Sequence, residues 1–275
     1  MDVLQAIVLG IVQGLTEFLP ISSSGHLRVV PAFFGWEDPG AAFTAVTQLG
    51  TMAAVLVFFR QDLWKILVAT LRSVPGERWR SPDLDARVGW LIVLGTIPIS
   101  VIGLAFKDVI ESGARDLYVI GIALIVFSFV ILRAEAVGRQ DRKIGQITAR
   151  DGLIIGLAQA IALIPGVSRS GATISAGLAL GFNRVDAARY SFLLSVPAVV
   201  LSGLFEMRSI GSDHGGAAAG FTATAVATVL AFIVGYASIA FLLRFVANHS
   251  IAIFCGYRVL LGVAVLALAG AGLIS

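Results

Sequence analysis

Two short polar strings, each embedded in apolar sequence, carry the residues whose chemistry points to a reactive site. The first string supplies a carboxylate, an amide, an imidazole and three hydroxyls, from Glu17, Gln13, His26, Ser22, Ser23 and Ser24. The second supplies a guanidinium and three hydroxyls, from Arg169, Ser168, Ser170 and Thr173. Ionisable groups at membrane depth are costly and usually mark a functional site. We therefore take these ten residues as the candidate site.

This set of side chains suits phosphoryl transfer. The planar guanidinium of Arg169 matches phosphate oxygens, and helices starting after Gly25 and Gly171 would add positive dipole ends for an anion. His26 titrates near neutral pH and can move a proton. Glu17, a carboxylate near phosphates, is typical of a site for a hard divalent cation. A site inside the bilayer would suit a lipid-linked substrate whose tail stays in hydrocarbon.

Simpler structural explanations exist for some of these residues. Gln13 and Glu17 are four residues apart and share a helix face, so Glu17 could form a buried ion pair with Arg169 that only fixes two segments together. That explanation leaves His26 and the serines without a role. The Ser23 hydroxyl could likewise satisfy the backbone of a loop instead of reacting.

The composition indicates how these residues are held. Of the 275 residues, 57% are hydrophobic and only 13% are charged, with a mean hydropathy of +0.92, whereas soluble chains are about 25% charged. This excludes a soluble enzyme, a coiled coil and a disordered chain, and predicts an all-α polytopic membrane protein. The net charge of +3 needs no nucleic acid, because most basic residues lie in two segments between apolar runs. The N-terminus lacks a basic region, so no cleavable signal peptide is expected.

Six apolar runs are long enough to cross a bilayer, and they cover residues 41–59, 88–106, 117–132, 190–205, 215–243 and 251–273. Two further apolar segments, residues 3–20 and 152–165, end in proline, glycine and serine, which break a helix. Freed backbone groups must then be buried in protein or line a wet cavity. We interpret residues 3–36 and 152–183 as re-entrant helix–loop–helix hairpins; the alternative is two ordinary spans that end in polar loops.

Loop charge predicts the orientation, because basic loops stay cytoplasmic. Two loops are rich in basic residues: Arg60, Lys65, Arg72, Arg78, Arg80 and Arg87 in one, and Arg133, Arg139, Arg142, Lys143 and Arg150 in the other. With six spans, both termini then lie outside, the first hairpin enters from the outer face and the site opens outward. Arg258, which interrupts the last run, is expected to snorkel to cytoplasmic head groups.

An internal repeat supports this organisation. A shift of 146 residues lays Gln13 on Gln159, and residues 22–25 on residues 168–171. A single membrane domain, residues 1–275, then has two halves, about 1–135 and 150–275, each with one hairpin followed by three spans. An odd number of crossings per half inverts the second copy, as in folds whose sites lie between broken helices at the midplane. The two Ser-Gly tips should therefore face each other.

The two strings resemble the signature motifs of the undecaprenyl-diphosphate phosphatases of the bacitracin-resistance type. They read Gln13-Gly-Leu-Thr-Glu17-Phe-Leu-Pro20-Ile-Ser-Ser-Ser-Gly-His26 and Pro165-Gly-Val-Ser-Arg169-Ser-Gly-Ala-Thr173. The resemblance implies an enzyme of the bacterial cytoplasmic (inner) membrane that removes the terminal phosphate of undecaprenyl diphosphate and so recycles the cell-wall lipid carrier. It also implies bacitracin resistance, because that antibiotic sequesters the diphosphate lipid.

The resemblance also implies roles for individual residues. Glu17 matches an acidic residue associated with a divalent metal, Mg²⁺ or Ca²⁺, and Gln13 falls where many members have glutamate. Ser23 and His26 match the catalytic serine and histidine, and Arg169 matches the phosphate-binding arginine. The remaining hydroxyls are expected to bind phosphate, namely Ser22, Ser24, Ser168, Ser170 and Thr173. His26 would act as a general base toward either Ser23 or a water molecule.

Two rival functions follow from the same residues. A lipid-phosphate transporter or flippase could use Glu17 and His26 to relay protons while Arg169 carries the anion. A phosphatidic-acid-type phosphatase is less compatible, because residues 174–185 contain neither the histidine nor the aspartate that it needs. The expected partners are undecaprenyl diphosphate and membrane lipids, without nucleic acid; a homodimer stays open.

Overall fold

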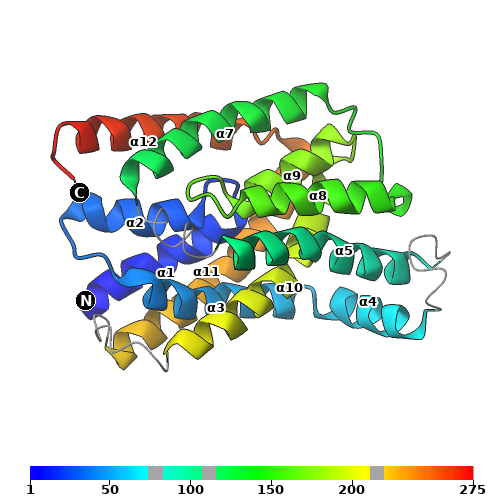
Figure 1. Ribbon diagram of the computed structural model, residues 1–275, viewed down its shortest axis with the longest axis horizontal. Coiled ribbons are helices and arrows are strands. Elements are labelled where there is room, and N and C mark those ends of the chain that lie inside the picture. Colours follow the sequence, from blue (N-terminus) through cyan, green and yellow to red (C-terminus); the bar gives the residue numbers. More distant parts are fainter. Residues whose placement is uncertain (74–82, 107–115, 211–219, 275) are drawn as a thin grey trace.

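The chain folds into a bundle of helices that run along one long axis (Figure 1). A computed structural model describes residues 1–73, 83–106, 116–210 and 220–274, with only the backbone described at 41–42 and 202–210. In chain order the helices are α1 (Val3–Phe18), α2 (Ser23–Phe34), α3 (Gly40–Phe58), α4 (Arg60–Arg72), α5 (Leu84–Ala105), α7 (Leu117–Val137), a short 3₁₀ turn η2 (Ile144–Gln146), α8 (Ala149–Ile161), α9 (Arg169–Ala179), α10 (Arg184–Ile210), α11 (Phe221–Asn248) and α12 (Ala252–Gly270). The predicted all-α class is confirmed for the described residues.

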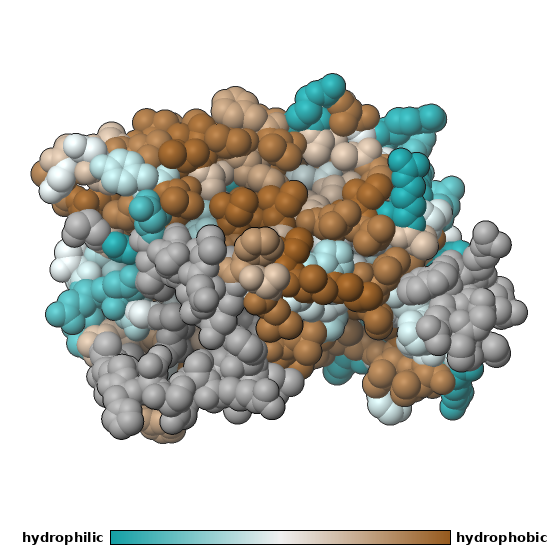
Figure 2. Space-filling model, viewed as in Figure 1, coloured by the Kyte–Doolittle hydropathy of each residue, from teal (hydrophilic) through white to brown (hydrophobic). Residues whose placement is uncertain are grey.

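Several of these helices fit a multi-pass membrane protein. Among the described residues, α5, α7, α11 and α12 are long and apolar enough to cross a membrane, and α3 with α4 would add a fifth span despite a bend of 77°. The predicted span at 190–205 lies within α10, while residues 215–219, Arg78 and Arg80 fall outside the described residues. Figure 2 shows apolar residues over the middle of one face and hydrophilic residues toward the ends of the long axis.

The two helix breaks predicted near the polar strings are present. Pro20 ends α1, since proline disfavours a helical conformation in the preceding residue, and the chain between α8 and α9 turns at Gly166 with φ +92°. α2 and α9 begin at Ser23 and Arg169. The expectation that these helices start only after Gly25 and Gly171 was therefore wrong, because the side chains of Ser22 and Ser168, three residues before these glycines, cap both helices.

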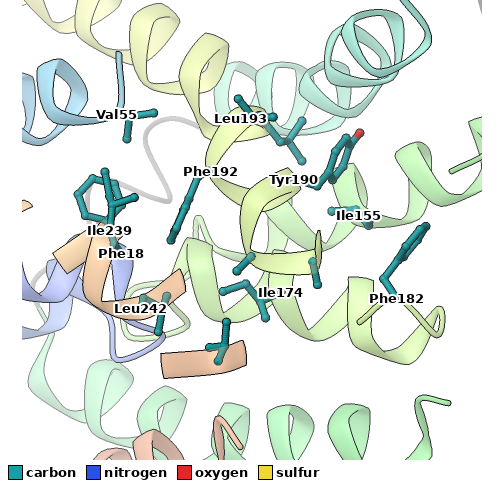
Figure 3. Close-up of a cluster of buried hydrophobic side chains, with 14 of the residues drawn as sticks. Phe18, Val55, Ile155, Ile174, Phe182, Tyr190, Phe192, Leu193, Ile239 and Leu242 are labelled. Atoms are coloured by element: carbon teal, nitrogen blue, oxygen red, sulfur yellow. The ribbon is translucent and has the colours of Figure 1, made fainter. Parts of the chain in front are cut away.

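Close packing holds the ends of the broken helices in place. Phe18, the last residue of α1, packs edge-to-face on Phe192 of α10 with ring centroids 5.5 Å apart (Figure 3). Earlier in α1, a Cβ added at Gly10 would lie 2.5 Å from the carbonyl oxygen of Ala227 in α11. Small residues let helix backbones approach closely in membranes, so α1 lies directly against α11.

Candidate active site

The two helix breaks have the same local geometry. Ser22 and Ser168 adopt positive φ values of 76° and 78°, and each accepts a hydrogen bond from the backbone N–H three residues later. In both tips the capping serine also lies within hydrogen-bond reach of the serine two residues later, at 3.4 Å for Ser24 and 3.1 Å for Ser170. The two tips are therefore alike both in backbone shape and in side-chain contacts.

The tips meet, as the sequence predicts. Arg169, the first residue of α9, forms an ion pair with Glu17 in the last turn of α1. Ser170 donates a hydrogen bond of 3.0 Å to the carbonyl oxygen of Leu19, in the loop between α1 and α2. Residues separated by about half the chain thus form one polar cluster inside the helical bundle.

Glu17 is the centre of this cluster. One carboxylate oxygen accepts from Arg169, and the other accepts from Ser23 Oγ at 2.7 Å and from Gln13 Nε2 at 3.2 Å. The Gln13 side chain is buried, yet its carbonyl oxygen has no hydrogen-bond partner among the described residues. An unpaired buried acceptor beside a carboxylate is an oxygen donor set of the kind that a hard cation uses. In the described part of the chain, no three His, Cys, Asp or Glu side chains lie together so that they could hold a metal ion.

The predicted phosphate-binding hydroxyls differ in how accessible they are. Ser24 is exposed and Ser23 is partly exposed, and 21% of the Arg169 side chain is exposed. The other four hydroxyls are buried and already contact protein groups; Thr173 on α9, for example, is bonded to Ser191 on α10. These four hydroxyls belong to Ser22, Ser168, Ser170 and Thr173. The accessible edge of the cluster is therefore formed by residues 23, 24 and 169, and the roles of the other hydroxyls stay predictions.

His26 lies one helical turn beyond Ser22 and points to a different partner than Ser23. Its Nδ1 atom is 2.7 Å from the carbonyl oxygen of Ser22, and its Nε2 atom is 2.6 Å from the hydroxyl of Tyr257 on α12. Among the hydrogen bonds described for this cluster, that of Ser23 Oγ goes to Glu17. Sequence reasoning missed Tyr257, because nothing local to it connects it with a residue 231 positions earlier.

Arg258 is buried between the two tips and does not reach head groups. Its side chain is fully buried and donates to the carbonyl oxygens of Pro20 at 3.2 Å and Gly166 at 3.0 Å, one in each tip. It also donates to Ser128 Oγ and to the carbonyl oxygen of Ala123 on α7. The expectation that Arg258 snorkels was wrong, because loop carbonyls freed by the helix breaks need donors at that depth. The sequence signal for a buried role of Arg258 was its charge inside the last apolar run.

Comparisons with known proteins show which family the chain resembles. A family model described as BacA, bacitracin resistance protein BacA, matches residues 6–264. The chain is 54% identical to a protein named undecaprenyl-diphosphatase from Nocardioides sp., with 100% of this chain and 99% of that protein covered. Proteins of the same name from Mycolicibacterium smegmatis and Thermobifida fusca are 54% and 50% identical, over 100% of this chain and 99% and 93% of their own lengths.

Proposed function

Since the chain belongs to the bacitracin resistance protein BacA family, we propose that it is an undecaprenyl-diphosphatase. It hydrolyses undecaprenyl diphosphate to undecaprenyl phosphate and inorganic phosphate, which recycles the cell-wall lipid carrier and confers bacitracin resistance. The observation that carries this proposal is the meeting of the two motifs, through the Glu17–Arg169 ion pair, at an edge that includes Ser23. The comparisons give no support to the alternative of a lipid transporter.

Substrate binding begins with an exchange of partners at Arg169. The guanidinium is partly exposed and pairs with the Glu17 carboxylate, so an incoming diphosphate competes with that carboxylate for the same planar donors. Arg169 then stabilises the negative charge that develops on the transferred phosphoryl group. The exchange also releases Glu17 from its strongest partner, which leaves an oxygen ligand beside the bound phosphate.

His26 serves as the general base of the reaction. It removes a proton from the nucleophile, which attacks the terminal phosphorus while the bond to the bridging oxygen breaks and undecaprenyl phosphate leaves. With Ser23 as the nucleophile, a phosphoserine forms and water then hydrolyses it; with water as the nucleophile, phosphate forms directly. Trapping a phosphoserine at Ser23 during turnover would identify the covalent route, and release of phosphate by Ser23→Ala at the wild-type rate would exclude it.

A divalent cation, Mg²⁺ or Ca²⁺, completes the proposed site. Glu17 and the unpartnered carbonyl oxygen of Gln13 are the residues that would hold it. When bound, such a cation neutralises charge on the diphosphate and on the leaving group. The single carboxylate is a weak cation site by itself, so the phosphate oxygens of the substrate are expected to supply further ligands.

Six spans, two re-entrant hairpins and an inverted repeat form the proposed topology, in the bacterial inner membrane with both termini and the site toward the outer face. In support, both chain ends lie at one end of the long axis, whereas the loop between α7 and α8 lies at the other (Figure 1). Gly156 follows Gly10 by 146 residues, and a Cβ added there would lie 2.4 Å from the backbone of Gly95 in α5. The α8–α5 crossing thus repeats the α1–α11 crossing.

Phosphate release from undecaprenyl diphosphate by the purified protein in detergent tests the function. Detergent removes any gradient, so turnover there separates a hydrolase from a transporter. We expect Arg169→Ala, Glu17→Ala and His26→Ala to lose most of the rate, by about 10²-fold or more, with folding intact. Near-normal turnover in these three variants would contradict the assigned site.

A cysteine at Ser24, which is exposed, reports the side of the membrane to which the site opens. Labelling by an impermeant thiol reagent only from the cytoplasm would refute the outward orientation.

A further inference from the structure

The contacts of His26 determine which of its ring nitrogens carries a proton. A carbonyl oxygen can only accept a hydrogen bond, so the Nδ1 atom, 2.7 Å from the Ser22 carbonyl oxygen, is the donor. In the neutral ring, Nε2 then has the free lone pair. The hydrogen bond of 2.6 Å between Nε2 and Tyr257 is therefore donated by the phenol.

The basic nitrogen of the proposed general base is thus covered by a hydroxyl group. A phenol oxygen can donate one hydrogen bond and accept others, so the same oxygen can donate to Nε2 and accept from an attacking water or serine. The rings of His26 and Tyr257 are nearly parallel, with an interplanar angle of 12°. The hydrogen bond of 2.6 Å between the phenol oxygen and Nε2 is the path along which a proton can pass between the two side chains.

Burial places Tyr257 on the accessible side of this pair. His26 is only 5% exposed, whereas Tyr257 is 45% exposed, so Tyr257 is the more accessible residue of the two. The neighbouring Arg258 bonds to the loop carbonyls of Pro20 and Gly166. These bonds hold α12 against both tips and keep the Tyr257 hydroxyl beside Nε2.

We infer that Tyr257 is a further catalytic residue, which relays a proton from the attacking hydroxyl to Nε2 of His26. The inference rests on the proposed role of His26 as general base. In the attack step, the nucleophile gives its proton to the phenol oxygen while the phenol gives its own proton to Nε2. At the end of the step Tyr257 is neutral and His26 is an imidazolium. The leaving phosphate then takes the extra proton from His26, which restores the neutral imidazole and closes the cycle.

Tyr257→Phe removes the relay and keeps the ring. We expect kcat for phosphate release to fall about 10²-fold, while KM stays near the wild-type value, because no phosphate contact is lost. Tyr236→Phe is the matched control, since Tyr236 is also partly exposed and packs on Phe58, and it should keep the wild-type rate. A Tyr257→Phe enzyme with unchanged kcat would overturn the inference.

Rates in mixtures of H₂O and D₂O separate a relay from a purely structural role. A relay moves two protons in the attack step, so the wild-type rate should curve with the deuterium fraction, and the rate of Tyr257→Phe should fall linearly. A linear wild-type plot would overturn the relay even if Tyr257→Phe is slow. Adding Tyr257→Phe to His26→Ala should cause no further loss, because the two residues act as a unit.

The same variants distinguish this inference from the proposed function. If His26→Ala is inactive while Tyr257→Phe is fully active, only the relay fails. If His26→Ala turns over at a near-normal rate, the general base is wrong and the relay falls with it. If Tyr257→Phe lowers the folded yield, 3-fluorotyrosine at position 257 is the alternative, because it keeps the shape of the side chain and its hydrogen bond. A changed rate of phosphate release with an unchanged thermal midpoint supports the relay. An unchanged rate overturns it.

Discussion

Replacing Arg258 by methionine would remove the donor shared by the two tips and keep most of the side-chain volume. The guanidinium makes four described hydrogen bonds, two of them to the carbonyl oxygens of Pro20 and Gly166. Hydrogen bonds between membrane helices contribute about 0.6 kcal/mol each on average, so four amount to about 2.4 kcal/mol. The variant no longer buries a charge, and this gain offsets part of the loss.

The effect on the reaction should exceed the effect on stability. Without Arg258, the carbonyls of Pro20 and Gly166 lose their common donor, and the two tips that carry Glu17 and Arg169 are held together less firmly. A misplacement of about 1 Å in an active site can cost roughly 10²-fold in rate. We therefore expect kcat of Arg258→Met to fall about 10²-fold, with a modest decrease in the thermal midpoint.

Phosphate release in detergent and a thermal unfolding scan measure the two effects on the same preparation. Arg258→Lys keeps the charge but replaces the planar fork with one ammonium group, so its kcat should lie between those of wild type and Arg258→Met. Arg139→Met is the control, because Arg139 is highly exposed and its ion pair with Asp141 lies at the surface. If Arg258→Met retained kcat within about two-fold of wild type, the positioning role argued for Arg258 would be refuted.

Three further predictions follow from the packing, the loop charges and the proposed cation. Gly156→Ala forces a Cβ into the backbone of α5 and should cost about 2 kcal/mol of stability, whereas Gly270→Ala, with open space around it, should leave the thermal midpoint unchanged; equal midpoints would contradict the close crossing. Burial by itself would raise the pKa of Asp151, but hydrogen bonds from Arg142 and Thr148 offset it and hold that pKa below its ordinary 3.8. The ionised Asp151 therefore stabilises the folded protein fully above that ordinary value, and this stabilisation is lost as pH falls through the lowered pKa. Asp151→Asn should then flatten the acid side of a plot of thermal midpoint against pH. An unchanged acid side would count against this linkage. Chelation by EDTA should stop phosphate release and added Mg²⁺ or Ca²⁺ should restore it; full activity in EDTA would exclude the cation.

The polar strings could be predicted from sequence because their signals are local. Pro20 and the serine clusters favour helix breaks through local effects, and Glu17 and Arg169 are conspicuous in a chain with so few charges. The opposition of the two tips was also predictable, because the internal repeat relates Ser22 to Ser168. Local rules were less accurate about where the helices restart, since a serine cap at positive φ begins them two residues before the glycines.

The contributions of α12 could not be predicted, because they depend on contacts between distant segments. Arg258 was visible as a charge in an apolar run, but its partners are carbonyl oxygens of two loops that only the fold brings to one helix. Tyr257 gave no sequence signal, because tyrosines in membrane helices commonly serve as interfacial anchors. The pairing of Gln13 and Glu17 was readable from their spacing, whereas the unpartnered oxygen of Gln13 appears only once the neighbours are in place.

The amino-acid sequence by itself determined that this is a polytopic helical membrane protein with two polar helix breaks and a set of side chains suited to phosphoryl transfer. Composition and local backbone preferences are enough for that, since they act within a few residues of each position. Only the tertiary structure decided which side chains touch: Arg169 on Glu17, Tyr257 on His26, and Arg258 on both tips. The physical reason is that freed backbone groups and buried charges must find partners inside the bundle, and the nearest partner in space need not be near in the chain.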